Sequence, residues 1–194
     1  MKALFFVYDH YAEFEVSLLA LFLKNFGKIV TVGNKAKGEV VTGEGGFRTL
    51  PHLELSEVNP SEYDVLVFPG GNVEAHLGHS EVLAMTRAFA EQGKLVAGIC
   101  GGTAFMGEAG LFNGKRYVHP FTEPEEQEKF GHLFPAETVQ PGEDIVIDGN
   151  VLTGREGCVY VEFAVAVTKY FDLFESEQDE RENLLYFKNQ YVKS

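Results

Sequence analysis

The chain has 194 residues, of which 45% are hydrophobic and 13% aromatic, so it is long and apolar enough to bury a core. Its formal net charge of -13 disfavours nucleic acid as a partner, because phosphates would be repelled. The apolar run at residues 1–8 is too short for a signal peptide or a membrane span, and two cysteines in unlike contexts favour a reducing compartment. We therefore expect one cytoplasmic domain over residues 1–194, with neither nucleic acid nor membrane as a partner.

In the first half of the chain, short runs of Val, Ile, Leu and Phe alternate with segments of helical period. This alternation is typical of a mainly parallel sheet with helices on both faces. The predicted strands are residues 3–8, 28–32, 64–68 and 94–99. A helix with its apolar residues three or four positions apart precedes Gly27, and a second amphipathic helix is predicted at 81–92. Residues 40–55 contain a glycine cluster that predicts a hairpin or a small extension of the sheet.

The second half of the chain continues the same α/β pattern. A short strand is predicted at 115–118, and the charged residues 123–129 predict a solvated surface segment. The remaining predictions are a hairpin formed by 145–147 and 151–153, an apolar helix at 159–174 and a surface helix in the acidic stretch from Glu175. Together these elements predict a flavodoxin-like three-layer sandwich.

Cys100 has the most informative surroundings in the chain. An apolar strand runs directly into it, and Gly101, Gly102 and a helix of small residues follow. This pattern indicates a nucleophile elbow, in which a sharp turn exposes the side chain at the amino end of a helix. The helix dipole there would lower the pKa of the thiol and favour the reactive thiolate. The alternative is a small buried cysteine that only packs in the core.

Three segments are predicted to follow strands directly: residues 9–15, 69–71 and 100–102. In an open α/β sheet, ligands bind beyond the carboxyl ends of the strands, where the strand order reverses. We therefore expect these three segments to converge on one site.

The order of six motifs resembles the ThiJ/PfpI superfamily, which shares the sandwich of class I glutamine amidotransferases. The resemblance spans nearly the whole chain. The motifs are Ala12-Glu-Phe-Glu-Val16, Tyr63-Asp-Val-Leu-Val-Phe-Pro-Gly-Gly71, Val96-Ala-Gly-Ile-Cys-Gly-Gly102, Glu108-Ala-Gly-Leu-Phe-Asn-Gly114, Val118-His-Pro120, and Leu152-Thr-Gly-Arg-Glu-Gly157 before Glu162-Phe-Ala-Val165. It implies that Cys100 is a reactive nucleophile.

The resemblance also implies an acidic partner for the cysteine. Glu15 matches the acidic residue that reaches the nucleophile from the end of the first strand. A carboxyl group desolvated beside sulfur has a raised pKa, and in its protonated form it can donate to sulfur or to the substrate. Glu13 is the competing candidate, and either residue can instead serve only to favour the amino end of the helix.

The glycines match an oxyanion pocket in the family. Gly71 and Gly101 stand where backbone N–H groups would stabilise the alkoxide formed when Cys100 attacks a carbonyl, and Gly70 precedes Gly71 in the same turn. The alternative is that Gly70 and Gly71 only permit the turn.

His119 and Arg155 also occupy family positions. His119 matches a histidine near the cysteine, and it would act as a general base or orient water, unless it is structural. Arg155 would bind a substrate carboxylate or join subunits, unless it is an ordinary surface arginine.

The chain departs from two branches of the family. Protease-like members have histidine directly after the nucleophile, whereas this chain has Gly101, so a peptidase is disfavoured. The isocyanide hydratase branch also fits less well, because no Thr follows Cys100 and the acidic partner is Glu rather than Asp.

Two classes of function remain. The first is an enzyme whose Cys100 adds to the carbonyl of a small-molecule substrate without a cofactor, by amide hydrolysis or by glyoxalase or deglycase chemistry. The second is a redox or stress-response protein in which Cys100 senses oxidants. The resemblance implies a homodimer or a larger homo-oligomer. We expect no metal at His76 and His79, and we expect Cys158 to be an inert packing residue.

Overall fold

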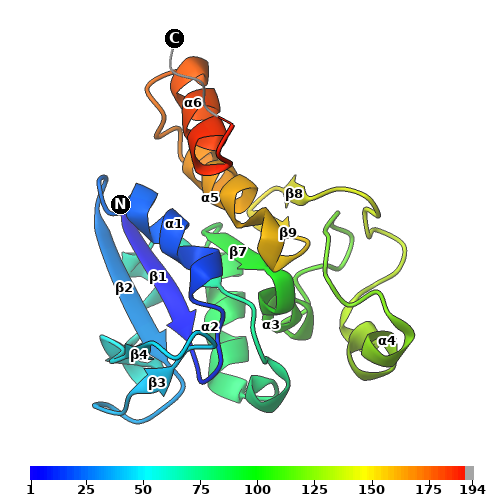
Figure 1. Ribbon diagram of the computed structural model, residues 1–194. Helices are drawn as coiled ribbons and strands as arrows, with labels where there is room; N and C mark the ends of the chain where they lie inside the picture. Colours follow the sequence, from blue (N-terminus) through cyan, green and yellow to red (C-terminus); the bar gives the residue numbers. More distant parts are fainter. Residues whose placement is uncertain (191–194) are drawn as a thin grey trace.

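The computed structural model describes residues 1–190 and contains a seven-stranded sheet with the order β5-β2-β1-β6-β7-β9-β8 (Figure 1). Every neighbouring pair is parallel except β8 and β9. The strands are β1 Lys2–Val7, β2 Lys28–Gly33, β5 Leu53–Glu54, β6 Val65–Phe68, β7 Leu95–Ile99, β8 Ile145–Asp148 and β9 Val151–Gly154. The prediction of a mainly parallel α/β sheet is confirmed.

The two faces of the sheet have separate hydrophobic cores, because side chains alternate along each buried strand. In β1, Leu4 and Phe6 belong to one core, and Ala3 and Phe5 belong to the other. The first core packs against α2 Ser80–Glu91 and α3 Thr103–Glu108; the second packs against α1 Phe14–Leu23, α5 Tyr160–Tyr170 and α6 Glu177–Phe187 (Figure 1). The three-layer architecture is therefore also confirmed.

Most predicted helices and strands are present, and the structure differs from the prediction mainly in short elements and at helix ends. The expected hairpin in 40–55 is formed by β3 Val41–Thr42 and β4 Arg48–Thr49. The charged segment forms a helix, α4 Pro124–Phe130, whose first turn is stabilised by a capping box between Glu123 and Glu126. The apolar helix expected to reach residue 174 ends at Tyr170, and β5 was not predicted.

The predicted strand at 115–118 is wrong. Only Tyr117 makes a bridge, to Val139, and the N–H of Val118 donates to the side chain of Thr153 at 3.0 Å rather than to a neighbouring strand. Short 3-10 turns complete the described structure: η1 Leu55–Glu57, η2 Pro60–Glu62, η3 Glu74–His76, η4 Cys100–Gly102, η5 Gly131–Leu133 and η6 Gly157–Val159.

The loops that follow β1, β6, β7 and β9 all leave the same edge of the sheet, because these four strands are parallel neighbours. Residues from widely separated parts of the chain thus meet beyond their carboxyl ends. Within residues 1–190, no helix combines the length and the apolar character needed to cross a membrane.

Candidate active site

Cys100 lies at the turn between β7 and α3, where the backbone conformation is unusual. Its φ angle is +53°, in the left-handed region that a residue with a side chain rarely adopts, at a cost of about 1 kcal/mol or more. The preceding Ile99 is still extended, and the turn continues directly into the helix that begins at Thr103. This is the strained strand-to-helix turn of a nucleophile elbow.

Glycines let two other backbones approach this turn closely. A Cβ atom added at Gly70 would lie 2.8 Å from the Cβ of Cys100 and 2.8 Å from Oε2 of Glu15. Gly71 has a φ of +106°, and a Cβ there would lie 2.1 Å from the carbonyl oxygen of His10. No other residue type fits at these positions without displacement of the backbone.

Glu15 is the carboxyl group that contacts Cys100. It lies in the first turn of α1, is 2% exposed, and accepts a hydrogen bond of 2.6 Å from the N–H of Gly70. Burial raises the pKa of the Glu15 carboxyl to about 7, although the bonds from Gly70 and Cys100 act in the opposite direction. Its protonation therefore changes near neutral pH.

Glu13 has a different role in the structure. Its carboxylate accepts hydrogen bonds from the N–H groups of Gly45 at 3.1 Å and Phe47 at 3.4 Å. It thus holds the turn between β3 and β4 rather than the cysteine.

The expectation of a resting thiolate at Cys100 is wrong. Burial and, second, the negative charge of Glu15 raise the pKa of the Cys100 thiol to about 12. The N–H groups of Gly101 and Gly157 act in the opposite direction, but they do not outweigh the desolvation. Cys100 is therefore a thiol at neutral pH, beside a carboxyl group that can accept its proton.

The structure brings Gly70, Gly71 and Gly101 together, but their backbone N–H groups have different surroundings. The N–H of Gly70 donates to Oε2 of Glu15, so it is already occupied in this arrangement. The N–H of Gly101 is directed at the sulfur of Cys100, and that of Gly71 has no acceptor within residues 1–190. Gly71 and Gly101 thus remain candidates for the oxyanion pocket.

His119 lies in an aromatic cluster. Its ring stacks on Phe134 with a centroid distance of 4.1 Å and an interplanar angle of 11°, and Tyr117 stacks on both His119 and Phe134. Burial lowers the pKa of His119 to about 4, so the ring is neutral at pH 7, and its Nδ1 atom is buried without a partner among the described residues. No hydrogen bond or ring contact within residues 1–190 joins His119 to Cys100.

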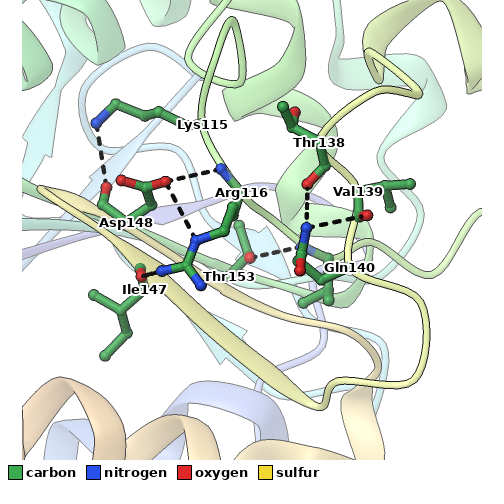
Figure 2. A network of polar contacts seen from close by, with 9 residues as sticks. Lys115, Arg116, Thr138, Val139, Gln140, Ile147, Asp148 and Thr153 are labelled. Atoms are coloured by element: carbon green, nitrogen blue, oxygen red, sulfur yellow. Dashed lines mark hydrogen bonds and ion pairs between the residues drawn. The ribbon is translucent and has the colours of Figure 1, made fainter.

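The segment before His119 is fastened to β8 and β9 (Figure 2). The backbone N–H of Arg116 donates to Asp148 at 3.0 Å, Lys115 donates to the Asp148 carbonyl at 3.2 Å, and Thr153 accepts from the backbone of Val118. These contacts replace the predicted strand and fix the position of the histidine.

Arg155 shares a cavity of about 320 Å³ with His119, and Cys100 is not among its lining residues. The guanidinium pairs with Asp144 at 2.7 Å and Glu156 at 3.4 Å. Two carboxylates of the protein therefore already pair with the guanidinium that was expected to bind a substrate carboxylate. The role of Arg155 in substrate binding stays a prediction.

Sequence reasoning missed two residues of the site. A Cβ at Gly157 would lie 2.5 Å from Oε1 of Glu15, so Gly157 closes the side of the carboxyl group opposite Gly70. Tyr8 donates to the carbonyl oxygens of Pro69 at 3.0 Å and Gly70 at 2.6 Å, which positions the turn after β6. Gly157 belongs to a recognised motif, whereas Tyr8 was assigned only to the first strand.

In the His76 and His79 pair, both ring nitrogens of His76 lie near polar atoms of other segments. Nε2 of His76 lies 2.9 Å from the carbonyl oxygen of Asp9, and its Nδ1 lies 3.0 Å from the side-chain nitrogen of Asn34. Among the described residues, no group of three or more His, Cys, Asp or Glu side chains is placed to hold a metal ion.

An α/β sandwich with a nucleophile elbow and a carboxyl partner defines the general class of this protein. The model of the DJ-1/PfpI family matches residues 1–170, and the chain belongs to that family. It is 30% identical over 156 residues to the deglycase TK1284 of Thermococcus kodakarensis, covering 80% of this chain and 90% of that one. It is 33% identical over 117 residues to the deglycase PfpI of Pyrococcus furiosus, covering 60% and 70% respectively.

The fold is also similar to solved structures. The thiJ/pfpI family protein of Bacillus anthracis superposes with a TM-score of 0.84 at 24% identity, over 97% of this chain and 91% of that one. DJ-1beta of Drosophila melanogaster gives 0.77 at 23% identity, over 98% of each chain.

Proposed function

We propose that this protein is a cysteine-dependent enzyme that attacks the carbonyl group of small aldehydes, with glyoxalase-like or deglycase-like chemistry. The observation that carries the proposal is the contact between the Cys100 thiol and Glu15, whose pKa of about 7 suits proton transfer near neutral pH. The names of the deglycase relatives support the same chemistry.

The first step is the activation of the thiol. The ionised carboxylate of Glu15 takes the proton of Cys100 as the sulfur forms a bond to the carbonyl carbon, and the π electrons move to oxygen. The N–H groups of Gly101 and Gly71 stabilise this oxyanion; loss of one such donor typically costs about 3 kcal/mol. No resting thiolate is required.

The second step returns the proton. Protonated Glu15 gives its proton to the oxyanion, which yields a hemithioacetal. With a 2-oxoaldehyde, transfer of hydrogen from carbon 1 to carbon 2 and hydrolysis of the resulting thioester add one water overall. The products are a 2-hydroxy acid and the free thiol, so no external oxidant or reductant is consumed.

The test compares methylglyoxal consumption with the hydrolysis of amide and ester substrates. We expect Cys100→Ser to lose activity by at least about a thousandfold and Glu15→Gln by about a hundredfold. Glu13→Gln is the matched control, because Glu13 is the other carboxyl of the same segment and holds the hairpin instead. Full activity in Cys100→Ser would refute the proposal, and turnover of amides alone would replace it with a hydrolase.

We also propose a homodimer. The surface carries an aromatic cleft of about 630 Å³ lined in part by Tyr11, Phe14, Phe47 and Tyr160. Phe47 is 71% exposed and Phe14 is 53% exposed, which is unusual for large apolar side chains on a free surface. Light scattering after size-exclusion chromatography should show a dimer that Phe47→Glu dissociates, and a monomeric wild type would contradict this proposal.

A further inference from the structure

Cys158 is not the buried packing residue that its position before an apolar helix suggested. It lies in the 3-10 turn η6 and is exposed, with its sulfur 3.9 Å from Oε2 of Glu156. The guanidinium of Arg155 lies close enough to interact electrostatically with it.

The fold brings this second thiol to the Cys100 site. Gly154, at the end of β9, pairs with Ile99, the residue immediately before Cys100. Three residues later, Gly157 packs against the carboxyl group of Glu15, and its N–H lowers the pKa of the Cys100 thiol. The Cα of Cys158 is only one peptide unit, about 3.8 Å, beyond the Cα of Gly157.

A disulfide requires Cα atoms about 4.4–6.8 Å apart. Gly157 contacts Glu15 beside Cys100, so bringing Cys158 within this distance requires a shift of the η6 turn and rotation of the Cys158 side chain away from Glu156. The turn is three residues long and begins with glycine.

We propose that Cys158 is the resolving thiol of Cys100, which captures its sulfenic acid as an intramolecular disulfide after oxidation by a peroxide. This inference is independent of the carbonyl chemistry, because it concerns a reaction with a peroxide rather than with a carbonyl compound, and a residue that the proposed turnover does not use.

In the first step, the sulfur of Cys100 attacks one oxygen of hydrogen peroxide and the O–O bond breaks. Glu15 takes the thiol proton and passes it to the leaving hydroxide, which becomes water, and Cys100 is oxidised by two electrons to the sulfenic acid. In the second step, the sulfur of Cys158 attacks the Cys100 sulfur and the S–O bond breaks. The thiol proton of Cys158 goes to the departing hydroxide, which leaves as water, and the disulfide remains until two equivalents of an external thiol reduce it.

The test treats reduced wild type, Cys158→Ser and Cys100→Ser with hydrogen peroxide, blocks free thiols with N-ethylmaleimide, and maps the peptides by mass spectrometry. In wild type we expect one linked peptide pair containing both cysteines, with the loss of two hydrogens, reversed by dithiothreitol. In Cys158→Ser, dimedone should trap the sulfenic acid at Cys100, and sulfinic acid should accumulate at about tenfold lower peroxide than in wild type. In Cys100→Ser, Cys158 should stay a free thiol during the peroxide treatment and then be alkylated by N-ethylmaleimide.

Two results would overturn the proposal. One is sulfinic acid at Cys100 of wild type while Cys158 is still free to react with N-ethylmaleimide. The other is a disulfide that joins two chains instead of one, seen as a covalent dimer on a non-reducing gel. Methylglyoxal turnover of the reduced protein is measured separately, so failure of the resolving thiol and failure of the carbonyl enzyme give different results.

Discussion

The ends of β6 and β7 and the region around β8 and β9 lie at the same edge of the sheet, but they are built in different ways. Around Cys100, backbones without side chains approach one another, and the carboxyl group of Glu15 lies between Gly70 and Gly157. Around His119, aromatic rings stack and leave a cavity of about 320 Å³. The first region tolerates no added atom, whereas the second has unfilled space, so the same kind of substitution should have opposite effects in the two places.

The largest effect is expected for Gly70→Ala. Its methyl group would overlap both Cys100 and Glu15, so the two reacting groups must separate. Overpacking of this kind costs about 1–3 kcal/mol, and displacement of about 1 Å can lower turnover a hundredfold. Calorimetry and the methylglyoxal assay measure the two effects.

Gly131→Ala is the matched control for that variant. Its added Cβ would lie 3.0 Å from the flexible side chain of Gln127, far from the cysteine in the chain, so activity should not change. Equal activity of Gly70→Ala and Gly131→Ala would show that the close packing at Cys100 is unimportant for turnover.

Glu15→Gln should change the pH dependence of stability. Because burial raises the pKa of Glu15 from 4.5 to about 7, the unfolded chain releases this proton at lower pH than the folded chain. The contribution of Glu15 to the free energy of unfolding therefore falls as the pH rises from 4.5 through 7, by about 3 kcal/mol at most. Glu15→Gln should be more stable than wild type at pH 8 and similar at pH 4.

Urea denaturation of both proteins at several pH values measures this difference. In the same series, wild-type turnover should rise with pH through about 7, because the ionised form of Glu15 is the base. A parallel pH dependence of stability in the two proteins would contradict the assigned pKa.

His119→Phe should have a small effect. Phenylalanine keeps the stacking on Phe134 and removes a buried nitrogen that has no partner within residues 1–190, so the melting temperature should stay equal or rise slightly. Turnover should remain within about threefold of wild type, since His119 makes no contact with Cys100 and its pKa of about 4 makes it a weak base. A hundredfold loss would return His119 to the mechanism.

The smallest effect is expected for Glu44→Gln. The backbone of Glu44 donates to Tyr11 at 2.8 Å, and its negative charge contributes to the raised pKa of Glu15. Removal of this charge should lower the pKa of Glu15, so turnover should begin to rise at a pH lower by about a few tenths of a unit. The shift should be smaller at high salt, which screens the charge. Glu39→Gln, on another exposed loop, is the control, and an identical shift in both would exclude a specific effect of Glu44.

The sequence predicts the Cys100 region well because its determinants are local. A strand, a cysteine and two glycines fix the turn with little help from the rest of the chain, and the glycine turn after β6 is similarly explicit. The parallel order of the strands then places Glu15 and Cys100 together, as the motif order suggested.

The remaining features depend on contacts between distant residues. The pKa of Cys100 is decided by burial and by a carboxylate of another helix, which overcome the helix dipole that the sequence suggested. The partners of Arg155 come from its own loop and from Asp144, and Gly157 reaches the site only through the pairing of β9 with β7. No local pattern reports such contacts.

The close packing of Gly70 and Gly157 around the carboxyl group of Glu15 limits which residues of this protein can change during evolution. The two residues that enclose the carboxyl group have no side chains, and any larger residue at either position meets Glu15 itself. Substitutions at Gly70 or Gly157 are therefore not a route to a new substrate. Productive changes should instead arise in the hairpin of β3 and β4 and in the loops around α4, whose exposed side chains can vary while the reacting pair stays unchanged.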